Sequence, residues 1–121
     1  MNKNLKRELR LIDWDFSGAW TQEGVHALHW FPSAFIPQVA SNLIRLLTKR
    51  GDLVLDPFCG SGTTLVESIK LGRRAVGLDN NRVGILVSAA KCSFFPVPKL
   101  RETLRQIYDA VSSKRLAPDA R

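Results

Sequence analysis

The chain has few of the residues from which cysteine-based chemistry or a membrane anchor could be built. Its 121 residues include only two cysteines, Cys59 and Cys92, a number and placement that indicate neither a disulfide framework nor a zinc site. No apolar run approaches the length of a transmembrane helix, and we expect no signal peptide. His26 and His29 have no third ligand nearby, so no metal site is expected. These absences predict a globular, metal-free protein in the reducing cytoplasm.

The most informative stretch joins an apolar run to a glycine-rich turn: Leu53-Val-Leu-Asp-Pro-Phe-Cys-Gly-Ser-Gly-Thr-Thr64. The run has no polar alternation, which predicts a short strand covered on both faces. Gly60 and Gly62 permit a tight turn and close approach of the backbone to a ligand, and Thr63 or Thr64 can open the next helix. Because ligands of open α/β sheets bind at the carboxyl ends of the strands, this turn is predicted to be a ligand loop.

What this loop lacks narrows the choice of ligand. A loop that cradles a nucleoside triphosphate ends in Gly-Lys-Ser/Thr, whereas Gly62 is followed here by two threonines. A dinucleotide fingerprint has a third glycine three positions later, where this chain has Leu65. Asp56, directly before the turn, would repel a diphosphate but suits a cationic or amino group. The loop therefore favours a cationic ligand over a nucleoside triphosphate or NAD.

A second carboxylate follows at the end of the next predicted strand. Ala75 to Leu78 form a short apolar run that leads into Asp79, about 20 residues past the glycine turn. A carboxylate in that place can accept hydrogen bonds from both ribose hydroxyls. A ribose partner and a carboxylate facing a cation together indicate S-adenosylmethionine, whose sulfonium and ammonium groups are both positive. The alternative is that Asp79 only caps the helix predicted from Asn81.

A second motif precedes the glycine loop. Residues His29 to Pro37 contain a histidine, then two residues and a proline, and a phenylalanine shortly before a second proline. This segment, followed by the loop, resembles the DNA methyltransferases that modify exocyclic amino groups of adenine or cytosine, over roughly residues 13–92. Ala34 departs from the family, where a basic residue is common. The resemblance implies a cofactor site in which the loop lies under S-adenosylmethionine, Asp79 holds the ribose, Asn80 lies beside the adenine and the upstream motif closes the methionine side. The residues it assigns to cofactor binding are His29, Pro32, Phe35, Asp56, Phe58, Cys59, Gly60, Ser61, Gly62, Thr63, Asp79 and Asn80.

The same resemblance implies a catalytic part that this sequence does not contain. The family's catalytic motif, a polar residue followed by Pro-Pro and an aromatic residue, is expected downstream of the loop, but no two of the six prolines are adjacent. A complete enzyme of this kind is also expected to be about twice as long. We therefore expect an α/β, Rossmann-like methyltransferase fold that is incomplete, with a mostly parallel sheet flanked by helices. Catalysis would need a second polypeptide or a missing carboxy-terminal half.

The charge of the chain suits a polyanionic partner. A formal net charge of +7 could neutralise DNA phosphates, although a solvated basic surface explains the same composition, and no module that reads a DNA sequence is visible. The expected organisation is a basic amino-terminal arm (1–12), a cofactor-binding region (13–98) and an amphipathic helix with a tail (99–121). Two other functions stay open: an RNA methyltransferase that acts on a guanine amino group, and a non-catalytic S-adenosylmethionine-binding or scaffold subunit.

Overall fold

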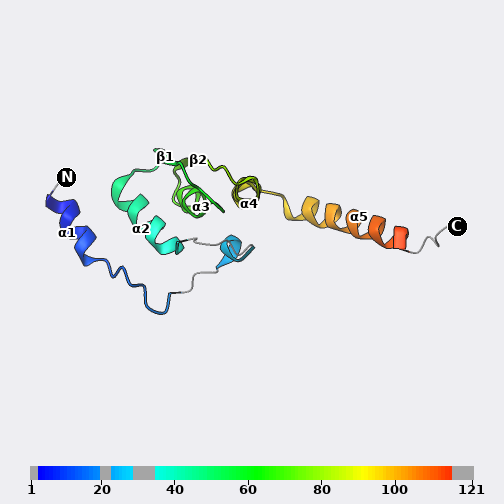
Figure 1. Cartoon of the computed structure of the whole chain (residues 1–121), viewed down its shortest axis with the longest axis horizontal. Helices are drawn as coiled ribbons and strands as arrows, with labels where there is room; N and C mark the ends of the chain where they lie inside the picture. Colours follow the sequence, from blue (N-terminus) through cyan, green and yellow to red (C-terminus); the bar gives the residue numbers. More distant parts are fainter. Residues whose placement is uncertain (1–2, 20–22, 29–34, 116–121) are drawn as a thin grey trace.

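The computed structural model describes residues 3–19, 23–28 and 35–115. Figure 1 shows a small α/β body with a helix extending from it toward each end of the chain. Within the described ranges the elements are, in chain order, α1 (Lys3–Leu11), the 3-10 helix η1 (Gly24–Leu28), α2 (Pro37–Leu47), β1 (Leu53–Asp56), α3 (Thr63–Lys70), β2 (Arg74–Gly77), α4 (Arg82–Cys92) and α5 (Val97–Arg115). His29 and Pro32, which the sequence assigned to the cofactor site, lie outside the described residues.

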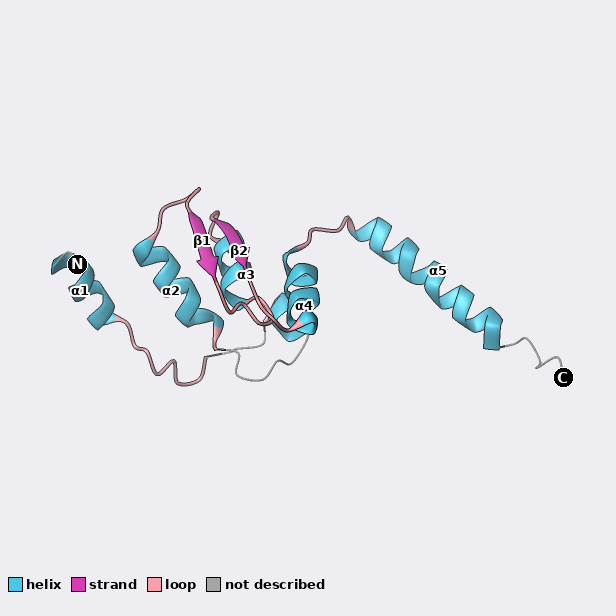
Figure 2. Ribbon diagram, turned by 45° about the horizontal axis from the view of Figure 1, so that its top comes forward, coloured by secondary structure: helices cyan, strands magenta, loops and turns pink. Residues whose placement is uncertain are grey.

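The centre of the body is a parallel unit of two strands joined through α3. β1 and β2 pair in parallel, with Leu53 opposite Arg74 and Asp56 opposite Gly77, and Figure 2 shows the two strands side by side. β2 begins one residue earlier than the sequence predicted, because the N–H of Arg74 already donates to the carbonyl of Asp52, at 2.8 Å. The carboxyl ends of both strands therefore lie at the same edge of the sheet.

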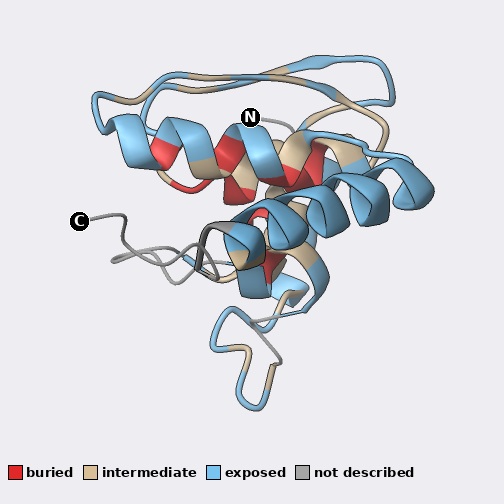
Figure 3. Cartoon of the chain, turned by 90° about the vertical axis from the view of Figure 1, so that its right-hand side faces the viewer, coloured by how far each residue is buried: buried red, intermediate tan, exposed pale blue. Residues whose placement is uncertain are grey.

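The prediction that the first strand is covered on both faces is wrong. Side chains alternate along each strand, and Leu53, Leu55 and Val76 are exposed, at 55%, 60% and 44%. The opposite face is covered, since Val54 borders a hollow lined by α2 and Gly77 lies against Leu65 of α3. Figure 3 shows the buried residues gathered on the helices beneath the strands. The core lies on one side of the sheet, between the strands and the helices α2, α3 and α4.

α5 continues the chain away from this body. It follows a short connection that contains Pro96, and Pro98 is tolerated in its first turn because the amide hydrogens there have no intrahelical acceptor. The sequence predicts an amphipathic helix within residues 99–121, and α5 extends over Val97–Arg115. In the described part of the chain, no helix combines the length and apolar character needed to cross a membrane.

Candidate cofactor-binding site

The glycine loop is fastened to the carboxyl ends of both strands by backbone hydrogen bonds. The N–H of Leu78 donates to the carbonyl of Asp56, and the N–H of Cys59 donates to the carbonyl of Leu78, both at 2.9 Å. The side chain of Asp56 accepts from the N–H of Phe58 at 3.0 Å, a local turn contact typical of aspartate. The loop thus turns over the strand ends, where ligands of such sheets bind.

Asp79 connects the second strand to the same loop. Its Oδ2 accepts from the N–H of Gly60 at 2.7 Å, and its Oδ1 accepts from the N–H of Asn81 at 2.8 Å. The bonds from Asn81 and then Gly60 favour the ionised form and lower the pKa of Asp79 below its ordinary value. A carboxylate has about four acceptor sites, so Asp79 retains acceptor capacity for a ligand while it holds the loop.

The helix after Asp79 has its own cap. Asn81 is the N-cap of α4, and its side-chain oxygen accepts from the N–H groups of Val83 and Gly84, at 3.0 and 3.4 Å. The alternative in which Asp79 serves only as the cap is therefore not what the geometry shows. Asp79 accepts one hydrogen bond from the N–H of Asn81, the residue just before α4 begins, and another from the N–H of Gly60 in the glycine loop.

Gly62 has a structural reason to be glycine. Its φ of +86° lies in the left-handed region, and an added Cβ would come within 2.7 Å of Cβ of Ser88. Gly62 is also the N-cap of α3, which begins at Thr63. The loop therefore lies directly against α4, and Ser88 belongs to the packing of the site although the sequence analysis did not assign it. The polar Ser88 within the apolar run from Val83 to Ala90 was the available signal.

The other predicted loop residues divide into buried and exposed groups. Cys59, Ser61 and Thr63 are buried, so these side chains support the loop from inside. Phe58 is 86% exposed at the strand ends, and Asn80 is exposed beside Asp79. An exposed aromatic ring next to a ligand loop provides an apolar surface for a ligand such as a purine.

Burial decides the chemical state of Cys59. Burial has the largest effect and raises the pKa of the thiol. A hydrogen bond with Ser88 lowers the pKa by less, and the nearby carboxylates of Asp56 and Asp79 raise it further. A thiol with a raised pKa is a poor nucleophile near neutral pH. Cys59 is therefore suited to packing in the turn.

Phe35 lies at the mouth of a separate hollow next to the loop. Together with apolar residues of α2, it lines a space of about 370 Å³ that also contacts Val54 and Thr64. Thr64 is the second residue of α3. Phe35, which belongs to the described part of the upstream motif, therefore lies near the start of α3. Phe35 is half exposed, at 47%, and is accessible from this hollow.

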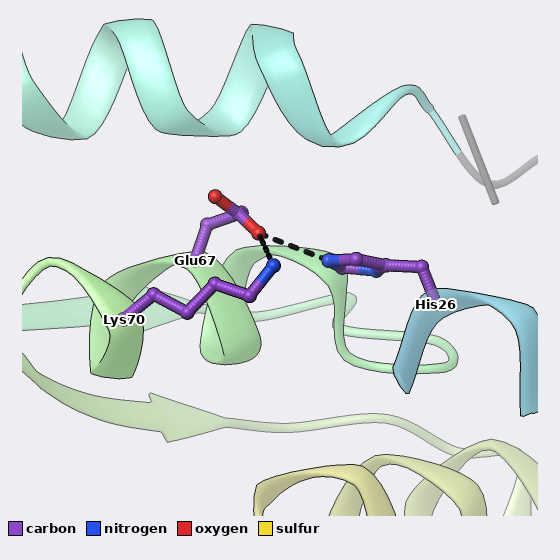
Figure 4. Close-up of polar contacts among 3 residues, drawn as sticks. All are labelled: His26, Glu67 and Lys70. Carbon is purple, nitrogen blue, oxygen red and sulfur yellow. Dashed lines mark hydrogen bonds and ion pairs between the residues drawn. The ribbon is translucent and has the colours of Figure 1, made fainter. Parts of the chain in front are cut away.

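The sequence did not indicate a charged cluster behind the loop, in which His26 and Glu67 are buried and Lys70 is half exposed. Nε2 of His26 lies 2.9 Å from Oε1 of Glu67, and Nζ of Lys70 lies 2.8 Å from the same oxygen (Figure 4). His26 belongs to η1, just before the upstream motif, and the other two residues belong to α3. From the sequence, His26 was weighed only as a metal ligand, and no metal site was expected. The signal that could have pointed to Glu67 was a carboxylate within the helix predicted after the glycine loop.

Comparison with known proteins defines the class of protein. Residues 2–87 match the family N6_N4_Mtase, described as DNA methylase, so the chain belongs to this DNA methyltransferase family. A curated relative, the type II methyltransferase M.MjaII of Methanocaldococcus jannaschii, is 30% identical over 115 residues; the match spans 89% of this chain and 22% of that protein. The chain thus spans about a fifth of the length of this relative.

Solved structures agree with the family and with the Rossmann-like methyltransferase fold. The crystal structure of the M1.HpyAVI–SAM complex matches with a TM-score of 0.50 and 27% identity, over 52% of this chain and 31% of that one. The cytosine-N4-specific PvuII DNA methyltransferase matches with a TM-score of 0.52 and 19% identity, over 90% of this chain and 34% of that one. The latter likeness concerns the fold alone. The cofactor predicted from the sequence is the one present in the M1.HpyAVI complex.

Proposed function

We propose that this chain forms the cofactor side of a site-specific DNA amino-methyltransferase. In this proposal S-adenosylmethionine binds across the carboxyl ends of β1 and β2, and the methyl group goes to the exocyclic amino group of adenine or cytosine. The hydrogen bond between Gly60 and Asp79 carries the proposal, because it brings the glycine loop and the second carboxylate to one place. The membership of the family supports the choice of cofactor.

The residues of the site suit the parts of this cofactor. Asp79 would accept from the ribose hydroxyls with its remaining lone pairs, Asn80 would lie beside the adenine, and Phe58 offers an exposed ring near the same edge. Asp56 adds its carboxylate to that of Asp79 at this edge of the sheet, and the two negative charges suit a ligand that carries positive charge. The bound cofactor would supply a methyl group on a positively charged sulfur.

The proposal assigns catalysis to another polypeptide or to a part of the protein outside this sequence. The amino group of a base is a weak nucleophile because its lone pair is delocalised into the ring. Acceptors for its hydrogens, together with in-line placement toward the methyl group, are needed to make it react. No Pro-Pro-aromatic motif is present to provide them. The family match extends from residue 2, across the upstream motif, which favours a DNA substrate over an RNA substrate.

Calorimetric titration with S-adenosylmethionine tests the cofactor site, with NADH as the control ligand. We expect saturable binding of S-adenosylmethionine and none of NADH. Asp79→Asn should weaken binding by about tenfold to a hundredfold, because a neutral amide oxygen is a weaker acceptor for the ribose hydroxyls than a carboxylate. Asp109→Asn removes the same charge from an exposed position on α5 and should bind as the parent does.

Two results would count against the proposal. A folded chain that fails to bind S-adenosylmethionine would favour the scaffold alternative, and equal binding by Asp79→Asn would remove the ribose assignment. Circular dichroism and urea unfolding of each variant establish that it is folded. Incubation with DNA and methyl-labelled cofactor should give no methyl transfer by the chain alone, and transfer by this chain without a partner would overturn the assignment of catalysis to another part.

A further inference from the structure

α5 exposes a continuous row of apolar side chains at a regular spacing. Each of these side chains is between 46% and 60% exposed, and Tyr108 beside the row is 72% exposed. The steps along the row are three, four, three and four residues. The row, here called the α5 seam, consists of Val97, Leu100, Leu104, Ile107 and Val111.

This spacing gives α5 one apolar face, and it is compatible with pairing to another helix. Apolar residues at alternating steps of three and four have a mean period of 3.5 and fill the a and d positions of a heptad. Figure 1 shows α5 projecting away from the α/β body, so the seam is accessible to another molecule.

The residues beside the seam permit two identical helices to meet. The flanking e and g positions between Val97 and Val111 hold Arg101, Thr103, Tyr108 and Ala110. Only Arg101 among them is charged, so pairing brings no row of like charges together. This is notable in a chain of net charge +7. The other charged residues of this stretch occupy outward positions: Lys99, Glu102, Arg105 and Asp109.

The exposed area is sufficient for a specific contact. The five seam residues and Tyr108 each expose on the order of 100 Å², so complete burial of all six in both copies would remove at most roughly 1,200 Å², the lower end of the range for specific protein interfaces. The seam covers little more than two heptads, which predicts a reversible association that depends on concentration.

We propose that α5 pairs with α5 of a second copy of this chain through the α5 seam. This inference does not depend on the cofactor proposal. Because α5 points away from the body (Figure 1), pairing would leave the glycine loop of each copy open. The resulting dimer would present two separate candidate cofactor sites.

Sedimentation equilibrium of the full chain over roughly a hundredfold range of concentration tests the pairing, because mass action makes the dimer fraction depend on concentration. The average mass should rise from one copy toward two. Replacing both Leu104 and Ile107 by alanine should weaken association by at least about tenfold, since each copy loses two buried apolar side chains. The matched variant replaces Arg105 and Gln106, on the outward side of the same turn, and should associate as the parent does. Alanine favours helix at all four positions, and circular dichroism checks that helix content is kept.

Leu104→Asp provides a second, charged disruption, with Gln106→Asp as its control on the outward side. We expect Leu104→Asp to remain a single copy at every concentration and Gln106→Asp to associate. A parent chain that stays a single copy throughout would overturn the proposal. Association that survives both seam variants would overturn it as well, because the contact would then lie elsewhere.

Discussion

His26 donates a hydrogen bond from Nε2 to Oε1 of Glu67 over 2.9 Å, and so joins η1 to α3 across 41 residues of sequence. Both side chains are buried, with exposures of 5% and 8%. Burial, the largest influence, acts to raise the pKa of Glu67, but the hydrogen bonds from His26 and Lys70 and their charges outweigh it, so that the pKa lies below its ordinary value of 4.5. The segment before α2 is thereby tied to the helix that begins at the glycine loop.

The contribution of this carboxylate to stability should depend on pH. Because the folded state lowers the pKa of Glu67, its stabilising effect is fully present above about pH 4.5 and is lost as the pH falls through the folded-state pKa. Glu67→Gln should lower the free energy of unfolding near neutral pH by about 1–3 kcal/mol, because the charged acceptor is lost. Urea unfolding across this pH range should also show a shallower loss of stability on acidification than in the parent.

Glu102→Gln is the matched control, since it removes the same charge from the exposed surface of α5. It should leave both the stability and its pH dependence close to those of the parent. If Glu67→Gln lost stability on acidification as steeply as the parent, the carboxylate would not be the titrating group.

Gly62→Ala tests the contact between the loop and α4. The new Cβ would meet Cβ of Ser88 at 2.7 Å at a φ of +86°, so we expect a loss of about 2–4 kcal/mol from strain and overpacking together. Gly51→Ala has nearly the same φ, +88°, and nothing within 4 Å of the added atom. It should cost only about 1–2 kcal/mol in the same unfolding experiment. Equal losses of unfolding free energy in the two variants would show that Ser88 moves aside for the added Cβ at little energetic cost.

Arg73 and Arg74 offer a comparison between two neighbouring arginines. Arg73 donates from Nε to Oγ1 of Thr48 at 2.9 Å and from an Nη atom to the Thr48 carbonyl at 2.8 Å, at the carboxyl end of α2. Lysine cannot reproduce this fork, so Arg73→Lys should lower the unfolding free energy by about 1–2 kcal/mol. Arg74→Lys, where the guanidinium makes one exposed contact of 3.3 Å with Gly51, should change it by less than about 0.5 kcal/mol. Similar effects of the two variants would contradict the role given to the fork.

The raised pKa of the Cys59 thiol predicts slow alkylation of the native chain. Near neutral pH little thiolate forms, so iodoacetamide should modify Cys59 at least about tenfold more slowly than in the urea-unfolded chain. Peptide mass spectrometry follows the modification. A cysteine placed at the exposed position of Ser113 is the control and should react at similar rates in both states. Rapid modification of native Cys59 would contradict its buried, protonated state.

The elements around the glycine loop could be predicted because local signals agree there. An apolar run, a turn with two glycines and a helical pattern follow each other directly, and β1 and α3 lie where this order placed them. α2 (Pro37–Leu47) begins at a proline, a residue that the first turn of a helix tolerates because the amide hydrogens there have no intrahelical acceptor.

Other features of the fold depend on contacts between residues far apart in the chain, which could not be predicted from local sequence patterns. The run Leu53–Leu55 indicated a buried strand, but a run of apolar residues does not say whether anything covers both faces, and here one face is bare. The pairing of His26 with Glu67 depends on how η1 docks on α3, and the contact of Gly62 with Ser88 on how α4 docks on the loop. Distances of this kind follow only from the assembled fold. The assignment of residues to the cofactor site itself stays a prediction.

The bond from Gly60 to Asp79 has a consequence for the thermodynamics of ligand entry. The bond joins two groups of the chain itself, so we expect part of the loop's conformational entropy to be lost during folding and not at the moment of association. A ligand that binds there meets an ordered surface, and a larger share of its interaction energy is available as affinity.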